Sequence, residues 1–305
     1  MDRLEAMNVF AATVDGGSLS AAGRRLNLPL ASVSRKLAEL EAHLKTRLLT
    51  RSTRRLELTD AGRDYLAACR QILEQVDEAE RAASGAYAKV SGQLVLSAPI
   101  VFGRLHLVPV AAAFLEAHAE VDLQLRLSDR NVNLIEEHVD AALRIGTLPD
   151  SNLVATPVGA VGRVVCASPA YLQRFGTPQS LAELQAHRCI SFEGLEAASS
   201  WTFTDGDGTR RRVPLRCRLS VSTADAAIEA ALLGLGPTRV LSYQVAEALR
   251  DGRLVRLLAH AEPPAVPASL IYAGQGRLPM KTRAFIDFAA GRLRDRLSSL
   301  SPPRA

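Results

Sequence analysis

Three amphipathic helical segments occupy the first 45 residues, and the turn-forming residues between them constrain the fold more than any other feature. The first segment, residues 4–14, stops at the pair Gly16-Gly17. Ser18 is placed to cap a short second helix, and Asn27 ends it because asparagine tolerates left-handed backbone. Pro29 suits the first turn of a third helix. Its predicted buried stripe is Val33, Leu37, Leu40 and Leu44.

Two short helices joined by a turn of three or four residues predict a helix-turn-helix, whose second helix enters the DNA major groove. Arg35 can donate a fork of hydrogen bonds to guanine, and the Ala31 methyl can meet a thymine methyl. The predicted DNA-contacting residues of the helices are Ser18, Ser20, Leu30, Ala31, Ser32, Ser34, Arg35 and Lys36.

A basic stretch, residues 47–58, follows with short alternating runs at its ends, which predicts a two-stranded wing. We expect its central residues to follow the phosphate backbone, with Arg54 or Arg55 reaching into a minor groove. The wing residues in this prediction are Arg51, Ser52, Thr53, Arg54 and Arg55. A basic hairpin can also merely solvate a helical bundle, but the ordered succession of helices and wing favours DNA binding.

The charge distribution agrees with a nucleic-acid-binding N-terminus. Residues 1–55 contain ten Lys and Arg against five Asp and Glu, and residues 56–88 contain three against seven. A basic segment followed by an acidic one fits a DNA-binding module attached to another part.

A long helix is predicted to begin after Thr59, with no proline and no glycine between Gly62 and Gly85. Its apolar positions approximate a heptad seam, which a lone helix must bury against a partner. Dimerisation is the favoured interpretation, and packing on the chain's own C-terminal domain is the alternative. The predicted dimerisation residues are Tyr65, Cys69, Ile72, Val76 and Ala79.

From residue 93 onward, strand-like runs alternate with helical stretches, which predicts a mostly parallel α/β sheet and room for two lobes with a cleft. The predicted strands are 94–97, 121–127, 141–145, 163–166, 189–192, 201–204, 211–221 and 268–273. The predicted helices are 104–118, 131–138, 180–187, 224–234, 242–250 and 280–296.

The N-terminal residues resemble those of the LysR-type transcriptional regulators. The resemblance rests on Gly17-Ser-Leu-Ser-Ala-Ala22, Arg25-Leu26, Val33-Ser34-Arg35, Leu40-Glu41, Arg47-Leu-Leu49 and Leu58-Thr-Asp-Ala-Gly62. It extends through Ser97-Ala-Pro99, Phe102 to Pro109, Asp140 to Gly146, Cys166 to Tyr171 and Gly234-Leu-Gly236. It implies an α+β multidomain protein: a winged helix-turn-helix over 1–58, a linker and dimerisation helix over 59–88, a hinge over 89–92, and an effector domain over 93–300.

The resemblance also implies a C-terminal domain similar to periplasmic solute-binding proteins. Its first lobe covers about 93–163 and 268–298, and its second about 164–267. The family implies a dimer of dimers on partly inverted repeats near promoters, with a small effector changing how the tetramer bends DNA. Leu30 and Pro29 depart from the family, in which glutamine and serine are common, so we expect apolar contact with a thymine methyl there.

The effector pocket is also located by the resemblance. The implied residues are Ser97, Pro99, Phe102, Ser128, Arg144 and Gly146 in the first lobe, and Phe192, Thr223, Ala224 and Thr238 in the second. Hydroxyl groups at a helix N-terminus suit an anion, so a small organic acid is the expected ligand. Arg144 can pair with such an anion, and a structural ion pair is the equal alternative.

Other functional classes are less well supported. The first ten residues, with two acids among the first five, do not resemble a signal peptide, and no uninterrupted run of 18 apolar residues occurs, so we expect a cytoplasmic protein without membrane association. No cofactor or metal is expected, because the four cysteines lack metal-ligand spacing. The sequence contains none of the catalytic motifs that a two-lobed α/β enzyme would need. A solute-binding transport protein leaves the helix-turn-helix unexplained, and a nonspecific architectural DNA binder differs from a regulator in sequence preference.

Overall fold

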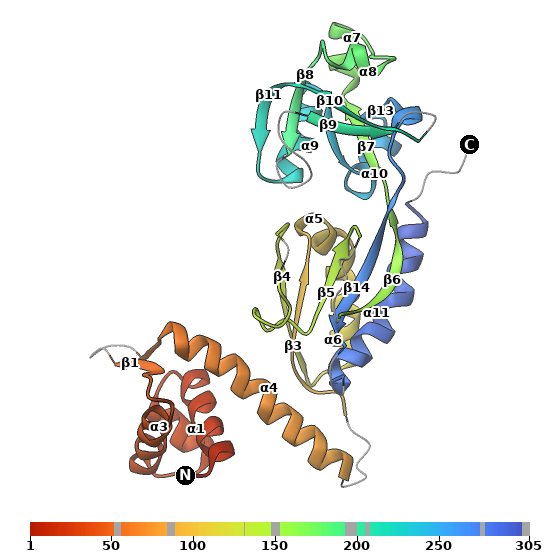
Figure 1. The fold of residues 1–305 in the computed structure, drawn as a ribbon. Helices are drawn as coiled ribbons and strands as arrows, with labels where there is room; N and C mark the ends of the chain where they lie inside the picture. The colour runs from red at the N-terminus through yellow and green to blue at the C-terminus, as the bar shows by residue number, and fades with distance from the viewer. Residues whose placement is uncertain are drawn as a thin grey trace. The chain divides into compact units, whose positions relative to one another are not determined.

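The computed structural model describes residues 1–51, 56–83, 89–130, 132–147, 153–192, 200–204, 208–274 and 278–300. The chain forms two compact units, Met1–Gly92 and Gln93–Ala305, each described here by itself. Figure 1 shows the elements of both units.

Three helices, a two-stranded hairpin and a long helix build the N-terminal unit. The elements are α1 (Arg3–Asp15), α2 (Leu19–Leu26), α3 (Leu30–Leu44), β1 (Leu49–Arg51), β2 (Leu56–Leu58) and α4 (Asp60–Ala83). The Ser18 hydroxyl caps α2 by accepting the Ala21 N–H at 3.1 Å, and Asn27 ends it with φ 52°. The Thr59 hydroxyl accepts the Gly62 N–H at 2.9 Å at the start of α4. The local turn and cap signals in the sequence are therefore confirmed.

Apolar side chains from every helix of this unit share one interior. Val33, Leu37 and Leu40 are buried on α3, as their spacing predicted. Phe10 from α1 packs with Leu37, Leu40 and Leu48 and with Cys69 of α4. The antiparallel β1–β2 pair, with Leu49 opposite Leu58, closes the hydrophobic cluster at one side. This core fixes the orientation of α3 and therefore of its outward side chains.

Two five-stranded sheets form the C-terminal unit. The first has the order β4-β3-β5-β14-β6, and the second has the order β11-β8-β12-β7-β13. The strands are β3 (Gly92–Ala98), β4 (Val121–Leu127), β5 (Ala141–Ile145), β6 (Leu153–Val161), β7 (Arg163–Ala167), β8 (Arg188–Phe192), β11 (Arg216–Val221), β12 (Thr238–Leu241), β13 (Val255–Leu257) and β14 (Val266–Ala273). A separate hairpin pairs β9 (Ser200–Thr204) with β10 (Arg210–Pro214).

Helices flank both sheets of this unit. They are α5 (Ile100–Phe102), a π-helix (Gly103–Leu107), α6 (Val108–Ala117), α7 (Pro169–Phe175), α8 (Leu181–Leu184), α9 (Ala224–Leu232), α10 (Ser242–Arg250), a 3₁₀-helix (Ala259–Ala261) and α11 (Met280–Ser298). The chain passes from the first sheet to the second between β6 and β7, and it returns between β13 and β14. These two crossings define two lobes.

The sheets are mixed, so the prediction of a mostly parallel sheet is corrected. β3 pairs with β5 in parallel, but β14 runs antiparallel to both β5 and β6. In the second sheet β8 is parallel to β11 and β12, whereas β7 is antiparallel to β12 and β13. The antiparallel pairs arise because the chain crosses between lobes directly after β6 and β13, without the helical crossover that parallel neighbours need.

Two local predictions are wrong, and three strands were not predicted. The segment predicted as the helix 131–138 forms a turn over residues 134–138, in which the Asn133 side chain accepts the Ile135 N–H and His138 has φ 51°. The predicted strand 211–221 is two strands, β10 and β11, which pair with different partners. β6, β12 and β13 were not predicted.

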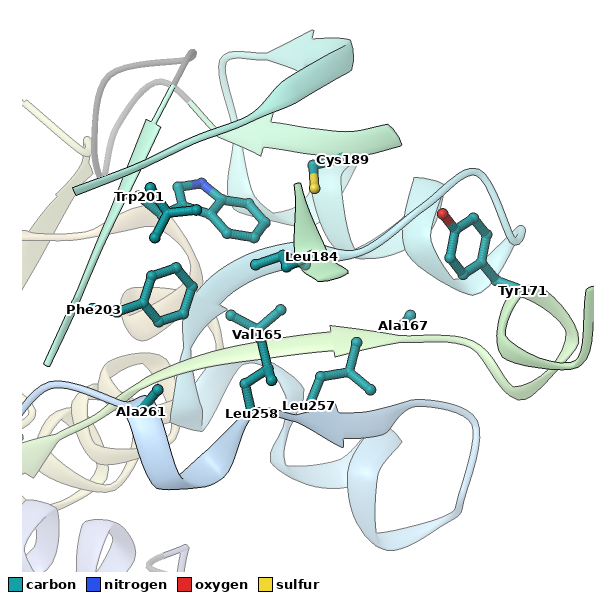
Figure 2. Packing of buried hydrophobic residues seen from close by; sticks show 11 residues of the cluster. Val165, Ala167, Tyr171, Leu184, Cys189, Trp201, Phe203, Leu257, Leu258 and Ala261 are labelled. Carbon is teal, nitrogen blue, oxygen red and sulfur yellow. The ribbon is translucent and has the colours of Figure 1, made fainter. Parts of the chain in front are cut away.

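The second lobe has a continuous apolar core. Trp201 and Phe203 of β9 pack with Val165, Leu184 and Cys189, as Figure 2 shows. A close backbone contact shapes the end of this lobe: a Cβ atom at Gly236 would lie 2.0 Å from the Arg188 carbonyl oxygen. Gly234, with φ 77°, follows the end of α9. The glycines therefore serve packing and helix termination.

Residues Ile100–Ala117 are long and apolar enough to cross a membrane by length and composition alone. A core helix passes the same test. Phe102, Leu107 and Phe114 of this stretch are buried in the C-terminal unit, which accounts for its apolar composition without a membrane.

Candidate nucleic-acid interface and ligand cavity

The N-terminal end of α3 presents a surface of apolar, hydroxyl and basic side chains. Leu30 is 52% exposed, and the Arg35 side chain is 72% exposed. Arg35 approaches Glu39 only loosely, at 3.9 Å, so its guanidinium is available to a ligand. Ala31 is exposed, and Ser32 and Ser34 are half-buried. A short polar and basic edge of this kind is what a recognition helix offers to base pairs.

Other predicted contact residues differ in availability. Ser20 is exposed and lines a hollow of about 470 Å³ between α2 and α3, together with Arg24 and Leu30. The Ser18 hydroxyl is occupied as the helix cap. Lys36 forms an ion pair with Glu5 of α1 and is only partly exposed. Arg24 was not among the predicted contacts, although its outward direction was visible in the sequence.

The predicted wing is only partly described. Arg51 is the last residue of β1. Ser52, Thr53, Arg54 and Arg55 lie outside the described residues.

The seam predicted on α4 divides into two parts. Cys69 is 0% exposed and packs inside the N-terminal unit, where burial raises the pKa of its thiol to about 11. Tyr65 contacts the same core, with its ring 5.9 Å from that of Phe10. Ile72 is 39% exposed, and Ala79 is exposed as well. Cys69 is buried inside its own unit, so its assignment to a dimer interface is corrected. The apolar stripe of α4 begins in the core of the N-terminal unit and continues onto its surface.

A cavity of about 110 Å³ lies between the two lobes of the C-terminal unit. Its lining residues are Pro99, Ser128, Asp129, Arg144, Ile145, Arg163, Phe192, Leu241, Tyr243, Gln244 and Val266. Four predicted effector residues are thus brought together: Pro99, Ser128, Arg144 and Phe192. The cavity lies beside the lobe crossing after β6, where Arg163 begins β7.

The other predicted effector residues are not among the lining residues. Ser97, Phe102 and Ala224 are all buried, Ala224 on α9. The Thr238 hydroxyl donates to the Ile190 carbonyl at 3.2 Å, and the Thr223 hydroxyl accepts the Ala226 N–H as the cap of α9. Gly146 follows β5 with φ 125°. The two hydroxyls therefore form hydrogen bonds with backbone groups, and the glycine permits a positive φ after β5.

Arg144 has a structural role that the sequence did not predict. Its guanidinium donates to the carbonyl oxygens of Arg130 at 3.1 Å and Val132 at 2.6 Å. It therefore holds the turn that follows β4. Neither of the predicted alternatives, a ligand anion or a structural carboxylate, is its partner in these two bonds.

Two other polar groups of the lining are buried without a hydrogen-bond partner. They are the Nε of Arg163 and the Oδ2 of Asp129. The Asp129 Oδ1 accepts the Ile100 N–H at 3.1 Å. Burial raises the pKa of Asp129, the Ile100 bond lowers it, and the nearby Asp225 carboxylate raises it further. Buried polar groups without partners are costly, so the cavity favours a polar ligand.

Tyr243 and Gln244 were missed by the sequence analysis. Both lie at the start of α10, directly after β12, and β12 itself was not predicted. Without that strand, nothing in the sequence placed the helix start at the cleft. Asp129 and Arg163 were also not predicted, although Asp129 follows the predicted pocket residue Ser128 and Arg163 begins the predicted strand 163–166.

Several side-chain contacts join the two lobes. Arg104 of the first lobe pairs with Asp225 of α9 at 2.9 Å. The Tyr243 ring lies 5.3 Å from Phe102 and 5.5 Å from His106. Both His106 ring nitrogens are buried without hydrogen-bond partners, and burial, with Arg296 nearby, lowers the pKa of His106 to about 4. The neutral imidazole therefore behaves as an aromatic packing group.

Across the part of the chain that the structure describes, no cluster of three or more histidine, cysteine, aspartate or glutamate side chains could hold a metal ion.

Two family models match this sequence. Residues 4–63 match the bacterial regulatory helix-turn-helix protein model of the lysR family, and residues 88–294 match the LysR substrate binding domain. The chain belongs to the LysR family. It is therefore a DNA-binding transcriptional regulator with an effector-binding domain, and its relatives are regulators rather than enzymes. Members of the LysR family oligomerise and bind small-molecule effectors.

Similar proteins cover almost the whole chain. An HTH-type transcriptional regulator of Xanthomonas campestris is 35% identical, over 93% of this chain and 84% of the relative. The structure of CrgA, a LysR-type regulator from Neisseria meningitidis, is 31% identical with a TM-score of 0.62, covering 95% of this chain and 98% of CrgA. The Vibrio cholerae virulence activator AphB is 28% identical with a TM-score of 0.60, covering 94% and 98%. The two-part architecture is shared with these LysR-type structures.

Proposed function

We propose that this LysR-family regulator binds partly inverted repeats near promoters as a dimer or tetramer in the cytoplasm, and that a small organic acid in the cavity between its lobes controls it. The observation that carries the DNA part is the exposed edge of α3, formed by Leu30, Ala31 and Arg35. Helix-turn-helix dimers place two such helices on two half-sites.

The bases contacted follow from the chemistry of that edge. Arg35 donates to the O6 and N7 of a guanine, and Leu30 and Ala31 contact a thymine methyl. Phosphate contacts come from the wing residues at Arg51 and beyond, and from Arg24 beside the hollow. Ser20, Ser32 and Ser34 bond phosphates or base edges.

The proposed effector site uses the cavity groups that lack partners. The Arg163 Nε donates to a carboxylate of the effector, and Ser128 and Gln244 provide further hydrogen bonds. Phe192 and Val266 contact its apolar part. Asp129 lies on the same lining, and its raised pKa lowers the cost of its taking up a proton when an acid binds beside it.

Selection of genomic DNA fragments by the full-length purified protein, followed by sequencing, tests the DNA part. Enrichment of partly symmetric sites beside promoters supports the proposal and identifies target genes. Uniform recovery of fragments overturns it in favour of an architectural binder, since a regulator prefers its sites by about 10³-fold or more.

Substituting Arg35 tests the base contact at one site. Arg35→Ala is expected to weaken binding by about 1–3 kcal/mol and to relax preference at one base pair. Arg253→Ala, at an exposed arginine of the C-terminal unit, is the control and is expected to leave affinity unchanged. Equal weakening on all sequences contradicts a base contact by Arg35.

A panel of small carboxylic acids, measured by thermal shift on the full chain, tests the effector part. A binding acid is expected to lose its shift in Arg163→Gln but not in Arg174→Gln, whose guanidinium lies against Phe175 elsewhere in the second lobe. An equal shift in both variants places the acid outside this cavity.

A further inference from the structure

Two cysteines face each other across neighbouring strands of the second lobe. β11 runs parallel to β8 at the edge of the sheet, and Cys217 is the register partner of Cys189. The register shifts directly after this pair, between Cys217 and Leu219, so the two thiols lie at an irregularity of the edge strand. Both cysteines are free thiols.

The spacing of paired strands suits a disulfide. Neighbouring strands lie about 4.8 Å apart, and register partners project from the same face of a sheet. Disulfides join Cα atoms separated by about 4.4–6.8 Å. Cross-linking this pair therefore requires side-chain rotation without separation of the strands.

The current positions of the sulfur atoms are compatible with such a rotation. The Cys217 thiol donates to the Leu219 carbonyl at 3.2 Å, and the Cys189 thiol points toward the His187 carbonyl at 3.9 Å. Thiols are weak hydrogen-bond donors, so little is lost when both side chains rotate.

The two thiols differ in environment. Cys217 is exposed on the edge strand β11, so its thiol is accessible to an oxidant in solution. Cys189 is buried in the apolar core beside Leu184, as Figure 2 shows, and burial raises the pKa of its thiol to about 12. The exposed thiol is thus placed to meet an oxidant first, with the buried one as its neighbour.

We propose that Cys217 and Cys189 are an oxidisable dithiol that a hydroperoxide converts into an intramolecular disulfide. The Cys217 sulfur attacks one peroxide oxygen, the O–O bond breaks, and the second oxygen leaves as an alcohol or water, giving a sulfenic acid. The Cys189 sulfur then attacks that sulfenic sulfur. The S–S bond forms, the S–O bond breaks, and the hydroxyl leaves as water with the Cys189 proton.

The position of the pair on the fold connects it to the cavity. Cys189 and the cavity residue Phe192 lie on the same strand, β8. Formation of this disulfide requires neither the effector nor the proposed DNA contacts, so its test is independent of theirs.

Mass spectrometry of the full-length protein tests the proposal. The reduced protein is treated with hydrogen peroxide, alkylated and digested with trypsin without reduction. The expected product is a disulfide joining the peptide 189–210 to the dipeptide 217–218, with loss of two of the four alkylatable thiols. Reduction is expected to release both peptides.

Variants separate the pair from general oxidation. Cys217→Ser, at an exposed position, is expected to leave Cys189 reduced under the same treatment. Cys166→Ser is the matched control, because Cys166 is equally buried in the same sheet but pairs in register with Thr238 and Arg256. It is expected to retain the disulfide. Overoxidation of Cys217 beside a free Cys189 thiol, a disulfide between two copies of the chain, or an unoxidised Cys217 overturns the proposal.

Discussion

His106 shows how one side chain makes the stability of the C-terminal unit depend on pH. Its ring is buried among Phe102 and Tyr243, and its pKa is lowered from the ordinary 6.5 to about 4. The unfolded chain therefore takes up a proton at higher pH than the folded chain. The stability associated with the neutral ring is fully present above pH 6.5 and is lost as pH falls toward 4.

His106→Leu is accordingly expected to reduce the loss of stability between pH 6.5 and 4. It also removes two unpaired buried nitrogens, which is expected to raise the free energy of unfolding at pH 7.5 by about 1 kcal/mol. Urea unfolding at several pH values measures both effects. His260→Leu, at an exposed position, is the control. An unchanged pH profile in His106→Leu would assign the acid sensitivity to other groups.

The pH dependence of stability expected from Asp129 runs in the opposite direction to that of His106. Its pKa is raised in the folded state, so stability is lost as pH rises through that raised value and the carboxylate becomes charged. Asp129→Asn is expected to raise the melting temperature at pH 7.5 and to have little effect at a pH below the ordinary aspartate pKa. Asp122→Asn, on the exposed side of β4, controls for surface charge. A lower melting temperature at neutral pH would show that the ionised Asp129 has a stabilising partner.

Helices and turns set by neighbouring residues were predictable from the sequence, whereas short strands set by distant pairing were not. Ser18 sets the start of α2, and Asn27 and Pro29 form the turn between α2 and α3; all three act within a few residues, and the sequence alone located them. β12 has only four residues, and its place between β7 and β8 depends on pairing with distant segments. Local periodicity does not encode such pairing.

Individual lining residues of the cavity were predicted where the preceding strand was predicted, and missed where it was not. Ser128 follows β4, a strand that the sequence predicted, and it lines the cavity as expected. Tyr243 follows β12, and its place at the cleft was therefore not visible. Arg144 was correctly located, but its two carbonyl partners, Arg130 and Val132, lie at the start of a segment that was wrongly predicted as a helix.

The exposed part of the apolar stripe on α4 is the predicted dimer contact. Ile72 is an exposed apolar residue beyond the core that buries Cys69, and we propose that a second copy covers it. Ile72→Asp places an unpaired charge in that contact, which is expected to raise the dimer dissociation constant by about 100-fold or more. Gln75→Asp adds the same charge at an exposed position of α4 and is expected to leave the dimer intact. Analytical ultracentrifugation measures both, and an unchanged mass for Ile72→Asp would move the interface elsewhere.

At the scale of the whole molecule, symmetric assembly and DNA recognition are linked. If two α3 helices of one assembly bind two half-sites, the half-sites must lie on the same face of the duplex, about one helical turn or a multiple apart. Inserting about half a turn between them, roughly five base pairs, rotates one half-site away from its helix. Inserting a full turn of about ten base pairs restores the face and changes only the distance.

We therefore expect the half-turn insertion to weaken binding to a selected site more than the full-turn insertion does. Fluorescence anisotropy with the full-length protein measures the three duplexes at one salt concentration, because affinity for DNA falls steeply with salt. Scrambling one half-site is expected to match the half-turn insertion, since either change leaves one recognition helix without its bases. Equal affinity for all spacings would mean that each α3 binds independently, and the proposed inverted-repeat recognition would then be wrong even if Arg35 contacts a base.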